Sequence, residues 1–123
     1  MDDQKKPILT FHIQSPDEKN DYQVVEFSGD MDSQGLEQIK NRVSELAENF
    51  AFKYLVFDLS GLTFINSESI GFLMELHSHL VKIKKTLVLC SARAYVKDVL
   101  SVIGILSVVD YHSSVEAFKK KIA

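Results

Sequence analysis

Cysteine and long apolar runs are scarce in this sequence of 123 residues. Its one cysteine, Cys90, excludes an internal disulfide and a cysteine-rich metal site, and its apolar neighbours predict a small buried side chain. No apolar run approaches the ~20 residues of a membrane span. The charged start, residues 1–6, has no apolar segment of the kind found in signal peptides. We therefore expect a cytoplasmic protein without a membrane span.

An excess of charge of either sign is also missing. Fourteen basic and 17 acidic residues give a net charge of −3, and the two kinds are interspersed. Because nucleic-acid binding needs a basic surface, we expect no direct contact with nucleic acid. A hydrophobic content of 46% over this length is enough for one core and too little for two ordinary domains. We expect a single domain over residues 1–123.

The signatures of common enzymes are absent too. The five glycines form neither a GxGxxG nor a GxxxxGK[ST] pattern, which argues against nucleotide binding in those modes. His77 and His79 lie two residues apart on a predicted helix, so they face different directions and cannot form an i, i+4 zinc pair. Asp58 follows a predicted strand but has no acidic pair with which to hold magnesium. The sequence thus favours an interaction module over an enzyme, with no metal and no cofactor.

Periodicity in the first part of the chain predicts two strands and a helix. Residues 8–13 alternate as in a half-buried strand, and the turn formers of 15–21 connect it to an antiparallel strand over Tyr22–Phe27. Residues 28–33 break the pattern and offer Asp32 or Ser33 as a helix cap. The apolar stripe of that helix should face the sheet; it comprises Leu36, Ile39, Val43, Leu46, Ala47 and Phe50.

The middle of the chain predicts a central strand followed by a helix. Tyr54–Phe57 is a continuous apolar run, typical of a parallel strand covered on both faces, and Gly61 is a turn signal. A helix is predicted over residues 68–84, with the preferred cap types Asn66 and Ser67 before it and the acid Glu68 in its first turn. Its core stripe is predicted to comprise Ile70, Leu73, Met74, His77, Leu80 and Val81.

The last part predicts further strand and helix units. Thr86–Cys90 reads as a buried strand, and a helix around Tyr95–Ile103 is expected to end at Gly104. The run Ile105–Val109 contains or borders a last strand, and a closing helix has the apolar stripe Val115, Phe118 and Ile122. The strand–helix–strand connections require parallel pairing. The prediction is an α/β fold with a mixed sheet of four or five strands and about four helices.

The strand–helix junction around Asn66 is where we place the function. The first N–H groups of a helix lack partners within the helix and carry partial positive charge. A serine hydroxyl at this place could carry a phosphate that the helix start partly compensates. A purely structural explanation stays open, in which Asn66 or Ser67 only caps the helix and Glu68 only complements its dipole.

The run from Val56 to Gly71, VFDLSGLTFINSESIG, resembles the signature of STAS domains, the anti-sigma factor antagonist family. Residues 29–32 and 99–105 are similar to two further segments of the family pattern. The resemblance covers essentially the whole chain and implies a STAS-like fold. It also implies binding to an anti-sigma factor with serine kinase activity, and a phosphatase that reverses the phosphorylation.

The sequence departs from that family where the phosphate is added. The family commonly reads Asp-Ser-Ser/Thr-Gly, with the second hydroxyl residue phosphorylated, whereas this chain has Asn66 at the aspartate, Glu68 at the acceptor and Ser69 at the glycine. Stressosome-type relatives are phosphorylated at the hydroxyl directly after the aspartate, which makes Ser67 the candidate here. Glu68 places a permanent negative charge at the position of the family's phosphoserine, so the unmodified chain could mimic the phosphorylated state.

The resulting prediction is a regulatory module that resembles anti-sigma factor antagonists and binds its partner through the loop 61–67 and the following helix start. The predicted contact residues are Gly61, Asn66, Ser67, Glu68, Ser69 and Phe72. Phe72, Leu76 and Ile83 form a second apolar flank on the helix, and this flank can serve as an interface only if Phe72 and Leu76 are exposed.

Three alternatives stay open beside this prediction. Relatives of this kind also act as unphosphorylated scaffolds or transporter-associated subunits. A ligand-binding or catalytic domain at the carboxyl ends of the strands is a further alternative, although no residue cluster supports it. Association of the chain with itself as a homo-oligomer is open as well.

Overall fold

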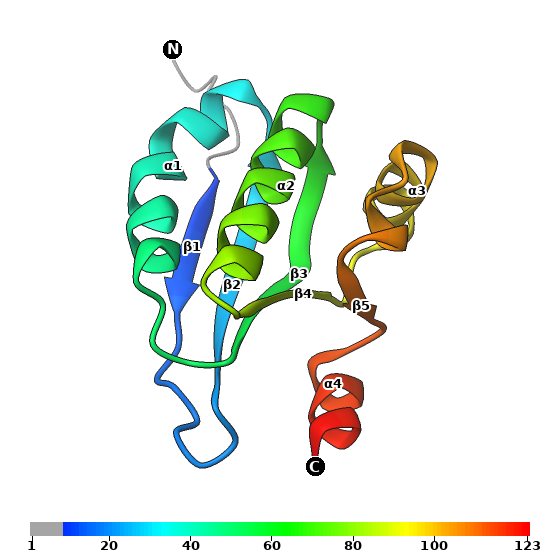
Figure 1. Ribbon diagram of the computed structural model, residues 1–123. Coiled ribbons are helices and arrows are strands. Elements are labelled where there is room, and N and C mark those ends of the chain that lie inside the picture. Colours follow the sequence, from blue (N-terminus) through cyan, green and yellow to red (C-terminus); the bar gives the residue numbers. More distant parts are fainter. Residues whose placement is uncertain (1–8) are drawn as a thin grey trace.

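A five-stranded sheet in the order β1-β2-β3-β4-β5 forms the centre of the protein, for which a computed structural model describes residues 9–123 (Figure 1). β1 pairs antiparallel with β2, and β3, β4 and β5 are added in parallel. The strands are β1 (Thr10–Ile13), β2 (Tyr22–Met31), β3 (Tyr54–Ile65), β4 (Thr86–Cys90) and β5 (Asp110–His112). The helices are α1 (Ser33–Glu48), α2 (Ser67–Lys82), α3 (Ala94–Ile103) and α4 (Val115–Ile122), with a 3-10 turn at Ile105–Ser107. The predicted α/β fold with a mixed sheet is confirmed.

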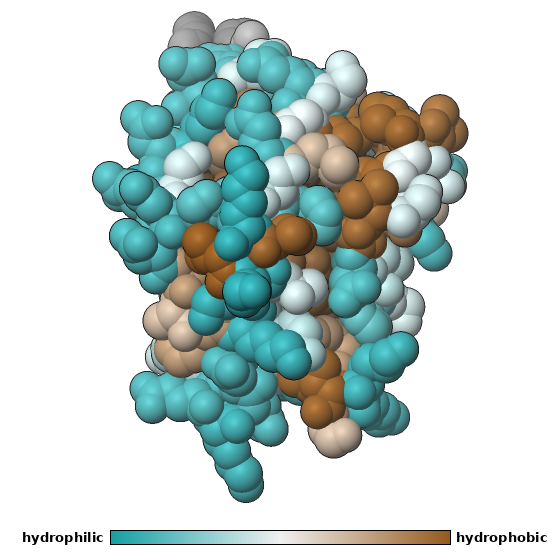
Figure 2. Space-filling view, viewed as in Figure 1, coloured by the Kyte–Doolittle hydropathy of each residue, from teal (hydrophilic) through white to brown (hydrophobic). Residues whose placement is uncertain are grey.

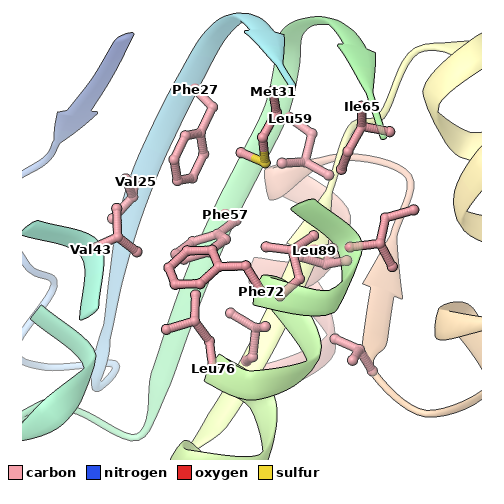
Figure 3. Close-up of a cluster of buried hydrophobic side chains, with 14 of the residues drawn as sticks. Val25, Phe27, Met31, Val43, Phe57, Leu59, Ile65, Phe72, Leu76 and Leu89 are labelled. Atoms are coloured by element: carbon pink, nitrogen blue, oxygen red, sulfur yellow. The ribbon is translucent and has the colours of Figure 1, made fainter. Parts of the chain in front are cut away.

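β3 is the central strand and is buried on both faces, as its apolar run predicted. Phe57 belongs to the large core cluster under α1, α2 and α3, whereas Val56 belongs to a smaller cluster that Phe118 of α4 covers. Figure 3 shows the large cluster, in which the rings of Phe27 and Phe57 meet edge to face with centroids 4.8 Å apart. Each fully buried side chain of this size contributes about 1.5–3 kcal/mol to the folded state, so this cluster fixes β3 and α2 relative to each other.

The predicted turn at Gly61 is wrong, because β3 continues as a strand to Ile65. Gly61 pairs with Ser28 of β2, and two register shifts each place one extra residue in β3. Such bulges let a strand bend and continue. A Cβ on Gly61 would lie only 2.5 Å from the Phe27 carbonyl oxygen, so the glycine permits the close approach of two strands. A glycine in a strand and one in a turn look alike in sequence.

The predicted end of β2 at Phe27 is wrong for a related reason. The strand runs on to Met31, and Gly29 within it has φ of 105°. Glycine adopts this left-handed conformation at little cost, so the ladder continues through the irregularity. The two extended strands together carry the start of α1 and the start of α2 to the same edge of the sheet (Figure 1).

Most other predicted elements are confirmed, with shifts at their ends. Thr86–Cys90 is β4, and Ile105–Val109 borders the last strand. Gly104 ends α3 in the left-handed conformation, with φ of 93°. The first strand spans only residues 10–13, and Ile8, which was included in its prediction, lies outside the described residues. α2 begins at Ser67 and ends at Lys82, slightly before the predicted end.

Two predictions about single side chains have opposite outcomes. Cys90 is fully buried, as predicted, and this burial raises the pKa of its thiol to about 12. Val81 was expected in the core stripe of α2, but it is 54% exposed. The apolar stripe of α2 turns towards α1 instead, through Phe72 and Leu76, and this leaves Val81 on the opposite flank.

Candidate functional site

Two helix starts lie next to each other at one edge of the sheet. β2 leads into α1 and β3 leads into α2, and Met31 at the end of β2 pairs with Ile65 at the end of β3. Only Asp32 precedes α1 after β2, and only Asn66 precedes α2 after β3. The predicted loop 61–67 therefore does not exist, because residues 61–65 belong to β3.

Each helix start is capped by the side chain before it. Asp32 Oδ1 accepts a hydrogen bond from the Gly35 backbone N–H at 2.8 Å, and Asn66 Oδ1 accepts one from the Ser69 N–H at 2.9 Å. Both residues were among the predicted caps. Caps of this kind satisfy one of the unpaired donors of a helix start and contribute about 1 kcal/mol each.

The two helix starts are joined directly by a side-chain hydrogen bond. Ser33, the first residue of α1, donates its hydroxyl to Glu68 Oε1 at 2.5 Å, and Asn66 Nδ2 donates to Ser33 Oγ at 3.4 Å. All three groups are accessible to solvent. The Glu68 carboxylate is thus held between the start of its own helix and the start of α1, where both dipoles favour a negative charge.

Ser67 is the first residue of α2, and its side chain is exposed. Two backbone N–H groups of the first turn have acceptors in Asn66. The Ser69 N–H donates to the Asn66 side chain, and the Ile70 N–H donates to the Asn66 carbonyl oxygen. The N–H groups of Ser67 and Glu68 have no protein acceptor within residues 9–123. A phosphate attached to the Ser67 hydroxyl would therefore lie beside unpaired N–H groups, which favour a negative charge.

Ser69 cannot serve as the surface contact that the sequence suggested. Its side chain is fully buried, and its hydroxyl donates to the Met31 carbonyl oxygen at 2.7 Å. The hydroxyl thus fastens the first turn of α2 to the end of β2. The sequence could not show this bond, since it depends on the extension of β2 as far as Met31.

Phe72 does not form the exposed flank that was predicted. Phe72 and Leu76 are only 4% and 5% exposed, because α1 covers this side of α2, and Figure 3 shows both side chains directed into the buried cluster. The ammonium group of Lys40 on α1 lies 5.9 Å from the centroid of the Phe72 ring. The interface prediction for this flank depended on its exposure and is withdrawn. Gly61, inside β3, is likewise separate from the helix start.

Two residues near Ser67 were not recognised as part of the site in the sequence. Ser33 was considered only as a cap for α1, although the parallel order of β2 and β3 brings the two helix starts together. Gly71 lies one turn after Ser67 on α2, is exposed, and would have no atom within 4 Å of an added Cβ. Packing within residues 9–123 therefore does not require a glycine at this position.

Residues 9–123 give no support for a metal site or a membrane span. Within that range no group of three or more His, Cys, Asp or Glu side chains is arranged to hold a metal ion. None of the helices in the same range has the length and apolar character needed to cross a membrane.

Comparison with known proteins agrees with the fold. The sequence profile of the STAS domain matches residues 6–118. An anti-sigma-factor antagonist (STAS) domain protein from Planctomyces limnophilus is 20% identical, with a TM-score of 0.79, over 92% of this chain and 97% of that one. An anti-sigma factor antagonist from Mycobacterium paratuberculosis is 16% identical, with a TM-score of 0.78, over 93% of each chain.

A third solved structure is that of a protein that carries a phosphate. The Bacillus cell fate determinant SpoIIAA in its phosphorylated form is 17% identical, with a TM-score of 0.67, over 91% of this chain and 99% of that one. At such identities the three likenesses show the shared fold, and the family follows from the profile match.

Proposed function

The chain belongs to the STAS domain family, and from this premise we propose that it is a regulatory module of the anti-sigma factor antagonist type. It binds an anti-sigma factor that is also a serine kinase, acts in the cytoplasm, and is itself no enzyme. The observation that carries the proposal is the exposed Ser67 at the start of α2, beside the linked side chains of Ser33 and Glu68. Asn66, Ser67 and Glu68 form the contact surface, and Gly71 leaves room for the partner.

Ser67 is the residue that the partner kinase phosphorylates, and a phosphatase reverses the modification. Three features support this choice over the other serines nearby. Ser67 is exposed next to free helix N–H groups, Ser69 is buried, and Ser60 lies within β3. Asn66 adds no negative charge beside the phosphate. The repulsion from Glu68 is reduced because its carboxylate is directed to Ser33 on α1.

Incubation with the cognate kinase and ATP, followed by mass spectrometry, tests the phosphorylation. Wild type and Ser60→Ala should gain one phosphate, and Ser67→Ala should gain none. Ser60→Ala is the matched control because Ser60 is also exposed but lies away from a helix start. Phosphate that persists in Ser67→Ala would overturn the assignment.

A binding measurement with the partner anti-sigma factor tests the contact surface. Ser67→Arg should weaken binding by at least about tenfold, because a bulky side chain is placed at the centre of the contact. Ser78→Arg is the control, since it puts the same side chain on an exposed position of the same helix three turns away. Equal affinity of the two variants would contradict a contact at the helix start.

A scaffold or transporter-associated subunit without phosphorylation is the second candidate. The favouring observation is the acid Glu68, which stands at the usual acceptor position in the first turn of α2. In this alternative the permanent charge of Glu68 takes the place of a phosphate, and no phosphorylation is needed to set the state of the site. Wild-type protein that gains no phosphate but still binds its partner tightly would favour this second candidate.

A further inference from the structure

α3 carries an apolar surface that the other described residues, 9–123, leave uncovered. Figure 2 shows hydrophobic surface gathered over this helix. We define the α3 patch as Tyr95, Val102, Ile103 and Val108, which are 55%, 86%, 48% and 54% exposed. Single exposed apolar residues are common, but a group of four large ones on one helix and the turn after it is not.

The α3 patch is not needed to hold α3 in place. The helix is anchored by Val96 and Leu100, which are fully buried in the large core cluster. The Tyr95 ring stacks on Phe64 of β3, with centroids 6.3 Å apart, which leaves the other face of the tyrosine open. Val102 is 86% exposed and therefore contributes little to the stability of the monomer. Its apolar side chain is better explained by a contact with another molecule.

The size of the α3 patch fits the centre of a modest protein interface. With ordinary side-chain areas, the four exposed fractions amount to roughly 400 Å² of apolar surface, a patch size that often marks an interaction site. A standard interface buries about 800 Å² on each partner, with an apolar centre and a polar rim. The α3 patch supplies the centre, and the polar residues around it supply the rim.

We propose that the α3 patch is the contact between two copies of this chain, packed with their α3 helices antiparallel. Tyr95 and Val102 lie two turns apart on one stripe of the helix, with the half-buried Val99 between them. The stripe has a large side chain at one end and a small one at the other. An antiparallel pair therefore sets Tyr95 of each copy against Val102 of the other, which makes the surface complementary to itself.

The dimer should be weak, because the apolar centre covers only about half of a standard interface. We expect a dissociation constant on the order of 10 µM. Sedimentation velocity between about 5 and 500 µM should show the mass rising from 13.9 kDa towards twice that value. This association goes beyond the proposed function and does not depend on it, since the measurement needs neither partner nor phosphate.

Two matched substitutions locate the contact. Val102→Glu should remove the dimer at all these concentrations without lowering the thermal midpoint, because Val102 is largely exposed. Val81→Glu makes the same change at a valine 54% exposed on α2 and should dimerise like wild type. A wild-type protein that stays monomeric, or a loss of the dimer in Val81→Glu alone, would overturn the proposal and leave the α3 patch to a different occupant.

A cross-link tests the antiparallel arrangement itself. Tyr95 and Val102 are both exposed, and the antiparallel arrangement places each of them opposite the other residue of the second copy, so cysteines at these two positions lie within reach of a disulfide. A mixture of Tyr95→Cys and Val102→Cys should therefore form a mixed covalent dimer on mild oxidation, whereas wild type should not, because Cys90 is fully buried. A dimer in solution that gives no such cross-link would overturn the contact through α3.

Discussion

α2 and α3 lie on the same face of the sheet, and their apolar residues have different fates. On α2, Phe72 and Leu76 extend beyond the stripe that meets the sheet, yet both are buried because α1 covers them. On α3, Tyr95 and Val102 also extend beyond the buried stripe, and nothing in the described chain covers them. Whether an apolar residue is buried thus depends on the presence of a neighbouring helix, which the sequence of its own helix does not show.

The same comparison separates the two proposed surfaces of the molecule. The start of α2 is polar and firmly placed, with Asn66 as a side-chain cap and Glu68 bonded to α1. The start of α3 has no side-chain cap, and Arg93 there donates its Nε–H to the Ser60 carbonyl oxygen at 2.8 Å. We propose partner recognition at the start of α2 and self-association through the α3 patch.

The largest expected effect tests whether the extra flank of α2 is part of the core. Phe72→Ala should lower the free energy of unfolding by about 3–5 kcal/mol, the usual cost of removing a buried aromatic side chain. Val102→Ala on α3 should change it by less than about 0.5 kcal/mol, because Val102 is 86% exposed. Urea denaturation at about 1 µM protein, where any dimer has dissociated, measures both. Equal losses would contradict the contrast between the two helices.

The sequence predicted the type and order of the elements where local chemistry decides them. The continuous apolar run at Tyr54–Phe57, the cap types Asp32 and Asn66, and Gly104 as a helix end depend on neighbours within a few residues. The continuation of β3 past Gly61 depends instead on its pairing with β2, and the need for glycine at position 61 depends on the nearby Phe27 carbonyl of that strand. A single sequence shows which residues are apolar or small, but it does not show what approaches them.

The site was predictable in part for the same reason. Ser67 and Glu68 were identified from a local pattern, and the resemblance to STAS domains gave the expected site its place in the chain. The bond from Ser33 to Glu68 and the burial of Ser69 involve residues more than 30 positions apart. They follow only once β2 and β3 are known to be parallel neighbours that end side by side.

A second prediction removes the cap that distinguishes the start of α2 from that of α3. Asn66→Ala should lower the free energy of unfolding by about 1 kcal/mol and speed hydrogen exchange in the first turn of α2. Ser67→Ala, one residue later, should change neither by a measurable amount, because the Ser67 side chain caps nothing. A loss in Ser67→Ala as large as that in Asn66→Ala would show that the helix start is arranged differently in solution.

A third prediction compares the glycines of the two helices. Gly71→Ala should raise the free energy of unfolding by about 0.5–1 kcal/mol, because it lies inside α2 and an added Cβ meets nothing within 4 Å. Gly104→Ala should lower it by a similar amount, because Gly104 ends α3 with φ of 93°. Thermal unfolding of both variants shows which substitution raises the free energy of unfolding and which lowers it. A destabilising Gly71→Ala would mean that the space beside it is occupied.

The smallest expected effect concerns the side-chain hydrogen bond between α1 and α2; within the described residues no such bond joins α3 to another helix. A double-mutant cycle of Ser33→Ala and Glu68→Ala isolates the energy of their hydrogen bond from the rest of the fold. Because both side chains are exposed, we expect a coupling of only about 0.5 kcal/mol. Ser33→Ala combined with Glu75→Ala, an exposed acid two turns further along α2, is the control and should show none.

The value of that coupling also bears on the choice between the two candidate functions. A measurable coupling means that Glu68 stays bound to α1 and that its charge is turned away from Ser67, which leaves room for a phosphate there. A coupling near zero would mean that the carboxylate moves freely beside Ser67 and opposes a second negative charge. The unphosphorylated scaffold would then be favoured, since Glu68 would supply the only negative charge that the start of α2 needs.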